Sequence, residues 1–289
     1  MALTGERMIY MPNKTLYISD LDGTLLDKTG RLTAHAADAL NTMIENGLNF
    51  TIATARAMGT AGIILKDLNL TIPIVLMNGV VIYDILRKNY VKINVITPDA
   101  VAAVVDAQRE LKITGIMRKI VDNEVISYYE STEQKMLRDF IDERRSIYNM
   151  PFVHTESFHD IKPENIIYFG IIDTQARLQL VCDALSDRTD INFSLYEDVY
   201  NPGQWFLEIS SAEASKKQAI EYLKTAYGYN QVICFGDNYN DLPMFEASDI
   251  RIAVANAKPE VLAAASHICA PNHEDGVVKW LLENAVTTA

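Results

Sequence analysis

Short apolar segments alternate with amphipathic segments of helical period near both ends of this chain. At the N-terminal end the pattern predicts strands over 15–19, 48–54 and 73–77, with helices over 33–46 and 57–68 between them. After residue 214 the alternation returns, with helices over 215–227, 241–247 and 275–285, another starting at Pro259, and strands over 231–235, 250–254 and 266–270. Helices between buried strands are typical of a parallel sheet with crossover helices. We therefore expect an α/β fold whose sheet is built from both ends of the chain.

The middle of the chain has a different pattern. It predicts helices over 98–111, 131–148 and 175–186 and strands over 113–120, 124–129, 166–172 and 191–195, the first two strands paired around Asp122-Asn123. This mixture indicates an α+β domain inserted into the α/β domain. The expected boundaries are residues 1–92 and 201–289 for the core and residues 93–200 for the inserted domain.

The composition narrows the classes of function. The 289 residues carry a formal net charge of −12, which argues against a nucleic-acid partner because such a partner requires a basic face. The sequence contains no run of about 18 apolar residues, so it predicts no membrane span. The polar N-terminus lacks the pattern of a signal peptide. The three cysteines, Cys182, Cys234 and Cys269, have no metal-type spacing and are expected to be reduced. We expect a cytoplasmic protein without a membrane partner; the sequence does not indicate its oligomeric state.

The strongest functional signal follows the first predicted strand directly, in Asp20-Leu21-Asp22-Gly23-Thr24. Ligands of open α/β sheets bind just beyond the carboxyl ends of the strands, where these two carboxylates fall. Gly23 allows the sharp turn that brings backbone amides close to the same place. The alternative is an Asx turn followed by a solvated acid, which explains one aspartate well and two poorly.

A second acidic loop lies more than two hundred residues later, in Gly236-Asp237-Asn238-Tyr239-Asn240-Asp241, again between an apolar strand and a helix. A helix N-cap formed by Asp241 is the alternative explanation, but a cap requires only one acid. Two acidic loops at the ends of two parallel strands can supply an oxygen-rich cation site, and hard oxygen ligands favour Mg²⁺.

Two further residues carry weaker signals. Thr54 closes the second predicted strand, where its hydroxyl could hold a phosphate, although such a hydroxyl more often completes a turn. Lys216 follows the plausible N-cap Ser215, and a lysine in the first turn of a helix opposes the macrodipole. An anionic partner would remove that conflict, whereas a solvated helix face is the alternative for Lys216 and Lys217.

Together these segments resemble the four motifs of the haloacid dehalogenase superfamily, in the branch of Cof-like phosphatases with a type IIB cap. The first motif matches Asp20-Leu21-Asp22-Gly23-Thr24, the second Thr54, the third Lys216 after Leu207-Glu208-Ile209, and the fourth Gly236-Asp237 to Asn240-Asp241. The similarity covers residues 15–90 and 201–289, including Met77-Asn78-Gly79. Two positions depart from the family pattern. Ala55 stands where glycine is usual, and Lys217 stands where a glycine often follows the third-motif lysine. The resemblance implies a Rossmann-like core and an inserted α+β cap.

The resemblance also implies a mechanism. A Mg²⁺-dependent phosphatase would use Asp20 as the nucleophile that forms an aspartyl-phosphate, with Asp22 as general acid and base. The metal would be held by Asp20, the backbone carbonyl of Asp22, Asp237 and Asp241, the last directly or through water. Lys216, Thr54 and Asn240 would bind the phosphate. Dehalogenases resembling this fold lack the second aspartate of the first motif and ion-pumping ATPases have threonine there, so Asp22 favours a phosphatase or a phosphomutase.

Motif spacing locates the cap. Only 31 residues separate Asp22 from Thr54, whereas 161 separate Thr54 from Lys216. The inserted domain therefore belongs in the second interval, where it would cover the site and select a small phosphorylated metabolite. Sugar phosphates, nucleotides and phosphorylated vitamin precursors all remain open as substrates. A phosphomutase and a phospho-receiver-like binding module remain the alternative functions.

Overall fold

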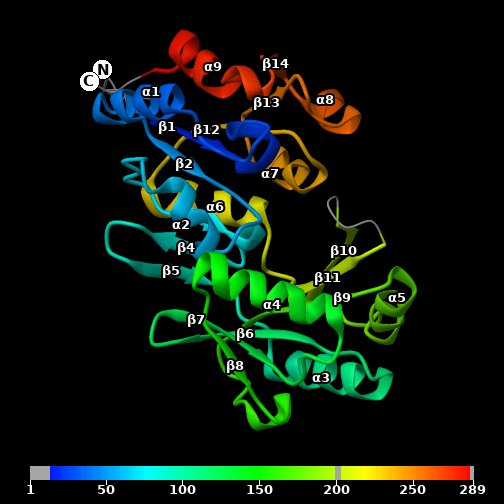
Figure 1. Cartoon of the computed structure of the whole chain (residues 1–289). Coiled ribbons are helices and arrows are strands. Elements are labelled where there is room, and N and C mark those ends of the chain that lie inside the picture. The colour runs from blue at the N-terminus through cyan, green and yellow to red at the C-terminus, as the bar shows by residue number, and fades with distance from the viewer. Residues whose placement is uncertain (1–13, 199–202, 287–289) are drawn as a thin grey trace, which may run out of the picture.

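The computed structural model describes residues 14–198 and 203–286. These form two stacked parts, with the described segments from β1 and α1 and from α7 to α9 in the upper part of Figure 1 and the inserted segment below. The upper part is built on a five-stranded sheet in the order β14-β13-β12-β1-β2, and every neighbouring pair is parallel. Its strands are β1 (Thr15–Ser19), β2 (Phe50–Ile52), β12 (Gln231–Gly236), β13 (Ile250–Val254) and β14 (His267–Cys269). The expected α/β fold with a parallel sheet from both chain ends is confirmed.

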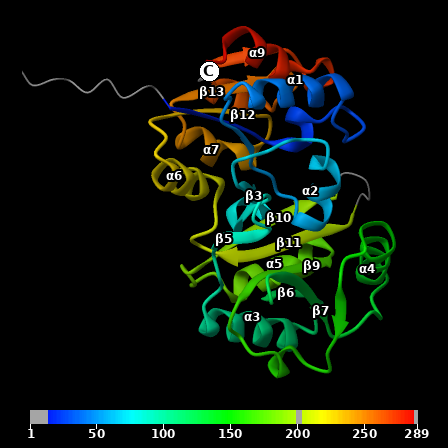
Figure 2. The same cartoon turned by 90° about the vertical axis from the view of Figure 1, so that its left-hand side faces the viewer.

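Helices cover both faces of this sheet (Figure 2). Helices α1 (Ala34–Glu45) and α9 (Gly276–Asn284) contact each other on one face, on the same side as α2 (Met58–Leu65). Helices α6 (Lys216–Tyr227) and α7 (Leu242–Glu246) lie on the other face, and α8 (Pro259–Ala264) contacts α7. All five residues of β1 are buried, as expected for a strand covered on both faces.

The third predicted strand leaves the parallel sheet. β3 (Ile74–Leu76) is joined to it by one bridge, Ala53 to Val75, and pairs instead in an antiparallel sheet with β4 (Val81–Asp84) and β5 (Asn89–Ile93). The sequence pattern did not predict this hairpin. The chain reverses through Met77 and Asn78, both at positive φ. Gly79 follows at φ +98, where a Cβ atom would lie 2.3 Å from the Ser215 carbonyl oxygen, so only glycine fits.

The lower part is a six-stranded sheet in the order β10-β11-β9-β6-β7-β8. Its strands are β6 (Gly115–Val121), β7 (Glu124–Tyr129), β8 (Phe152–His154), β9 (Ile166–Asp173), β10 (Ile191–Glu197) and β11 (Trp205–Ser211), antiparallel except for the pair β7 and β8. Helices α3 (Pro98–Leu111) and α5 (Gln175–Ala184) pack together on one face. Helix α4 (Lys135–Tyr148) packs on the other face through Leu137 and Ile141. No helix in residues 14–198 and 203–286 has the length and apolar character needed to span a membrane.

Two expectations for this part need correction. Strand β11 pairs with β9 and β10, so the inserted sheet extends through Ser211, whereas we expected the core to resume at residue 201. Helix α4 begins at Lys135 rather than at Ser131. Ahead of it, the Ser131 hydroxyl accepts from the Glu133 backbone N–H in a turn, and the Gln134 amide donates to the Ile172 carbonyl at 2.7 Å. These side-chain hydrogen bonds hold the segment out of helical conformation.

Candidate active site

The first acidic loop places Asp20 at the carboxyl end of β1. Its backbone N–H donates to the Phe235 carbonyl of β12, and its side chain is buried. The turn that follows depends on Gly23 at φ +82, where a Cβ atom would lie 2.4 Å from Asp237 Oδ2. Glycine is therefore required both for the backbone conformation and for the close approach of the second loop. Across this contact, the Thr24 hydroxyl donates to Asp237 Oδ1 at 2.7 Å.

The second acidic loop follows β12 and combines two tasks in Asp241. One oxygen, Oδ2, accepts from the backbone N–H groups of Asp237 and Asn238 at 2.9 and 3.0 Å, as the third residue of a capping box whose N-cap is Asn238, so Asp241 is not itself the N-cap that the alternative required. The other oxygen, Oδ1, accepts from Lys216 Nζ at 2.6 Å. A helix cap and a charged site are thus built from the same carboxylate, which is fully buried.

Lys216 joins the two loops from the first turn of α6. Its ammonium group donates to Asp20 Oδ1 and to Asp241 Oδ1, both at 2.6 Å, and its side chain is 1% exposed. Burial lowers the pKa of Lys216, but the two carboxylates raise it above its ordinary value, so the side chain stays charged. The alternative of a solvated helix face is therefore wrong for Lys216. Lys217 does lie at the surface, where its Nζ is 3.1 Å from Glu246 Oε2.

Asp20, Asp237 and Asp241 form a compact acidic cluster, with one oxygen from each within 4.8 Å of the others. Three carboxyl groups share one buried ammonium group, so the acidic groups of the cluster outnumber its single positive charge. Burial raises the pKa of Asp20 well above its ordinary value, with Lys216 opposing this shift. Burial likewise raises the pKa of Asp237 to about 6. The hydrogen bond from Thr24 opposes this rise, and the nearby charge of Asp241 adds to it. A convergent set of carboxylate oxygens with a charge deficit fits a hard divalent cation.

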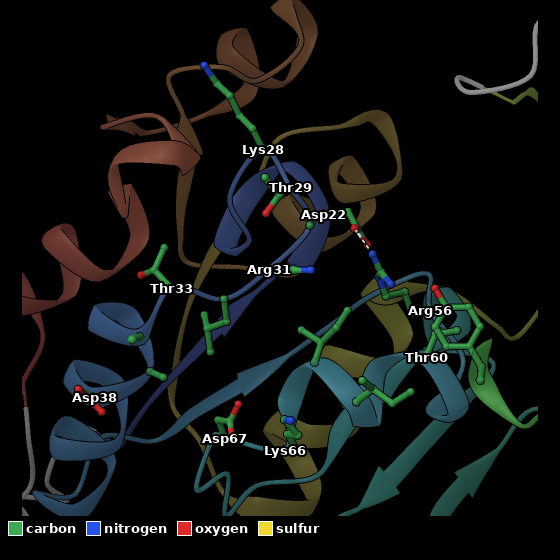
Figure 3. Close-up of a pocket in the computed structure, with 17 residues that line it drawn as sticks. Asp22, Lys28, Thr29, Arg31, Thr33, Asp38, Arg56, Thr60, Lys66 and Asp67 are labelled. Carbon is green, nitrogen blue, oxygen red and sulfur yellow. Dashed lines mark hydrogen bonds and ion pairs between the residues drawn. The ribbon is translucent and has the colours of Figure 1, made fainter.

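The side chain of Asp22 lies outside this cluster. Its two oxygens accept from Arg56 Nη2 and Nε at 2.6 and 2.7 Å. The side chain is half-exposed and lines a large cavity of about 1220 Å³ (Figure 3). We expected the Asp22 backbone carbonyl at the metal and its carboxyl group, facing the same site as Asp20, as general acid and base; the carboxyl is instead bonded to Arg56, and both roles stay predictions. Arg56 was assigned no role from sequence, although its place two residues after Thr54 could have indicated one.

The remaining phosphate-binding candidates are Thr54 and Asn240. Thr54 is buried, and its hydroxyl oxygen accepts from the Arg56 backbone N–H at 3.1 Å, which leaves the hydroxyl hydrogen for an acceptor. The turn role and an anion-binding role are therefore compatible at this position. The Asn240 amide donates to Asn78 Oδ1 at 3.1 Å. Asn78, from the Met77-Asn78-Gly79 turn, thus connects the antiparallel hairpin to the second acidic loop.

A second cavity, of about 240 Å³, separates this cluster from the inserted sheet. Its walls come from Asn78, Lys216 and Asn240 of the core and from strands β9, β10 and β11 of the inserted domain. The residues of the inserted domain that line it include Tyr168, Asn192, Ser194, Glu208 and Ser210. Their alternation along the strands is visible in the sequence, but only the pairing of β9, β10 and β11 shows that they share one face.

An acidic cluster with a buried lysine, at the carboxyl edge of a parallel sheet and beneath an inserted α+β domain, defines a hydrolase with an α/β core and a cap. A family model described as haloacid dehalogenase-like hydrolase matches residues 17–281. The chain belongs to this family and is a hydrolase of the phosphatase type. The expected family membership is confirmed.

Similar proteins agree with this assignment. The putative phosphatase YxeH of Bacillus subtilis is 27% identical over 275 residues, covering 91% of this chain and 96% of that protein. The 5-amino-6-(5-phospho-D-ribitylamino)uracil phosphatase YitU of the same organism is 23% identical over 272 residues, covering 91% and 95%. Among solved structures, the subclass IIB sugar phosphatase BT4131 matches with a TM-score of 0.71 and 22% identity, covering 93% of this chain and 98% of that one. This likeness extends over 93% of the chain, so the shared fold includes the inserted domain as well as the core.

Proposed function

We propose that this protein is a Mg²⁺-dependent phosphatase that hydrolyses small phosphorylated metabolites through an aspartyl-phosphate on Asp20. The observation that carries the proposal is the position of Asp20 beside Lys216, in a buried cluster with Asp237 and Asp241. The names of similar proteins, a phosphatase of a phosphorylated ribitylaminouracil and a sugar phosphatase, support the substrate class. The cavity of about 240 Å³ beside Lys216 is of a size for a small leaving group.

The cation site is part of the proposal. Asp20, Asp237 and Asp241 would hold the ion, together with the backbone carbonyl of Asp22, and Asp241 would bind directly or through water. A bound Mg²⁺ supplies positive charge that offsets the repulsion between a carboxylate and an anionic phosphoryl group. At about 4 Å and an effective dielectric constant near 20, each pair of like unit charges costs about 4 kcal/mol, which Lys216 alone does not offset.

The side chains of this chain divide the chemistry between them. Lys216 holds Oδ1 of Asp20, which leaves Oδ2 to attack phosphorus while the bond from phosphorus to the ester oxygen breaks. Thr54 and Asn240 would donate to the phosphoryl oxygens, because the Thr54 hydroxyl keeps its hydrogen for an acceptor and Asn240 lines the same cavity as Lys216. Asp22 would give a proton to the leaving oxygen and then take one from the water that hydrolyses the aspartyl-phosphate. This role requires the Asp22 carboxyl to turn away from Arg56 toward the site.

Phosphate release from an aryl phosphate, with Mg²⁺ and with EDTA, tests the proposal. Asp20→Asn keeps the size of the side chain and removes the nucleophile, and Asp187→Asn makes the same change at an exposed site of the inserted domain. We expect Mg²⁺-dependent turnover in the wild type and in Asp187→Asn, and none in Asp20→Asn. Turnover that survives in Asp20→Asn, or a folded wild type that is inactive on the aryl ester and on a panel of phosphorylated metabolites, would contradict the proposal.

A further inference from the structure

The cavity between the acidic cluster and the inserted sheet has an unbalanced charge. Among the described residues that line it, Lys216 and Glu208 are the charged ones, and Lys216 is already bonded to Asp20 and Asp241. The Glu208 carboxylate therefore determines the charge that a leaving group meets in this cavity. Its walls otherwise carry neutral hydrogen-bonding groups, among them Asn192, Ser194 and Ser210.

The position of Glu208 is fixed by its strand and its neighbours. It lies on β11, where its register partners are Ser194 on β10 and Gly170 on β9, so these residues share a row across the sheet. The Tyr196 hydroxyl donates to Glu208 Oε1 at 2.9 Å. Gly170 carries no side chain that would block this row, and a Cβ atom there would lie 3.0 Å from the Tyr168 ring. The missing side chain leaves space in front of the carboxylate, partly covered by that ring.

The nearby polar groups do not neutralise this carboxylate. Burial, together with the charge of Glu208 and a hydrogen bond to it, raises the pKa of Tyr168 well above its ordinary value, so this hydroxyl stays neutral and acts on Glu208 as a donor. Arg118 places its guanidinium 4.7 Å from the centre of the Tyr168 ring and is not among the residues that line the cavity. No ion pair joins Arg118 to Glu208 in the described part of the chain. Glu208 therefore has two neutral tyrosine donors and no ion-paired cation among the described residues, so its negative charge acts on a ligand in the cavity.

We propose that Glu208 is a specificity-determining residue that selects leaving groups carrying hydroxyl or amino donors and rejects those carrying a second anionic group. The proposal rests on the proposed phosphatase function, because the cavity is taken to hold the leaving group of a phosphomonoester. A carboxylate facing a ligand favours a cation over a neutral donor and opposes an anion. Monophosphates of amino or polyhydroxy compounds fit this cavity, whereas bisphosphates and phosphorylated carboxylic acids do not.

Six aryl monophosphates, which carry one of three substituents at one of two ring positions, test this proposal. The substituent is aminomethyl, hydroxymethyl or carboxylate, placed at the para or the meta position of the ring, so that a cation, a neutral donor or an anion enters the cavity at two depths. The variant is Glu208→Gln, whose amide oxygen can still accept from Tyr196. Glu164→Gln makes the same charge change at an exposed site away from the cavity and serves as the matched control.

We expect wild-type kcat/KM to fall in the order aminomethyl, hydroxymethyl, carboxylate. The ratio of kcat/KM for the aminomethyl ester to that for the carboxylate ester should fall by about tenfold or more in Glu208→Gln. The two substituents differ by two units of charge, and the variant has lost the carboxylate that distinguishes them. It should not change in Glu164→Gln. Comparing ratios between proteins cancels the intrinsic reactivity of each ester. An unchanged ratio in Glu208→Gln would overturn the inference while leaving phosphatase activity established, whereas no phosphate release from any ester would count against the proposed function itself.

Discussion

Replacing Lys216 with methionine should destabilise the protein in a manner that depends on pH. The ammonium group lies 2.6 Å from one oxygen of Asp20 and of Asp241, and all three side chains are buried. Methionine retains most of the volume and removes the charge, so two buried carboxylates lose their partner. Breaking a buried pair in this way typically costs about 3–5 kcal/mol.

The pH dependence follows from how the protein can relieve this loss. A buried carboxylate without a partner can take up a proton, which from the ordinary pKa of 3.8 costs about 4 kcal/mol at pH 7 and about 2 kcal/mol at pH 5. In Lys216→Met the folded state therefore binds more protons than the unfolded state, and its stability falls as the pH rises. Burial already raises the pKa of Asp20 in the wild type and Lys216 opposes that shift, so the destabilisation relative to wild type should be larger at pH 7 than at pH 5, by at most the difference of about 2 kcal/mol between these two costs.

Urea denaturation in EDTA at pH 5, 6 and 7 measures this difference. Lys217→Met is the matched control, because Lys217 makes an exposed ion pair with Glu246 and should cost less than about 1 kcal/mol at every pH. Added Mg²⁺ should recover part of the stability of Lys216→Met by binding the folded carboxylates. Equal stability of the two variants, or a Lys216→Met deficit that is the same at pH 5 and pH 7, would refute this account of the cluster.

Three other predictions test separate features of the molecule. Gly23→Ala should lower stability by about 1–3 kcal/mol and reduce phosphate release, because the new methyl group would displace Asp237; urea denaturation and activity measure both effects. Burial raises the pKa of Cys234 to about 12, so this thiol should react with a disulfide reagent at pH 8 only after denaturation, as thiol titration will show. The Arg188 guanidinium lowers the pKa of Asp190 to about 2, so the stabilisation by this pair, present above about pH 4, should be lost as the pH falls toward 2, and Asp190→Asn should remove that part of the pH dependence of unfolding.

The core and its acidic cluster could be predicted from sequence because each part has a local signature. A strand, a tight turn and two acids can be recognised within a few residues, and the carboxyl ends of parallel strands meet at one edge of the sheet. Asp20 and Asp237 were therefore expected to lie together before their distance was known. The placement of Lys216 needed the family resemblance in addition, since a lysine in a first helical turn is equally common at a solvated surface.

Other features depend on tertiary pairing that no local pattern records. The bond between Asp22 and Arg56 joins two loops 34 residues apart, and neither loop indicates it alone. Strand β11 has the alternation of any half-buried strand, so only its hydrogen bonds to β9 and β10 place it in the inserted sheet. The antiparallel pairing of β3 with β4 was missed because the reversal between them uses positive φ at Met77, a residue type that does not signal such a turn.

The most direct test of the central claim is to trap the proposed covalent intermediate. The enzyme would be mixed with Mg²⁺ and a rapidly hydrolysed aryl phosphate, quenched in acid within the first turnover, digested and analysed by mass spectrometry. We predict one phosphoryl group on the peptide that contains Asp20, located on that residue by fragmentation, and none in Asp20→Asn. A phosphoryl group on another residue, or phosphate release during the first turnover without any phosphorylated peptide at any quench time, would contradict the assignment of Asp20 as the nucleophile.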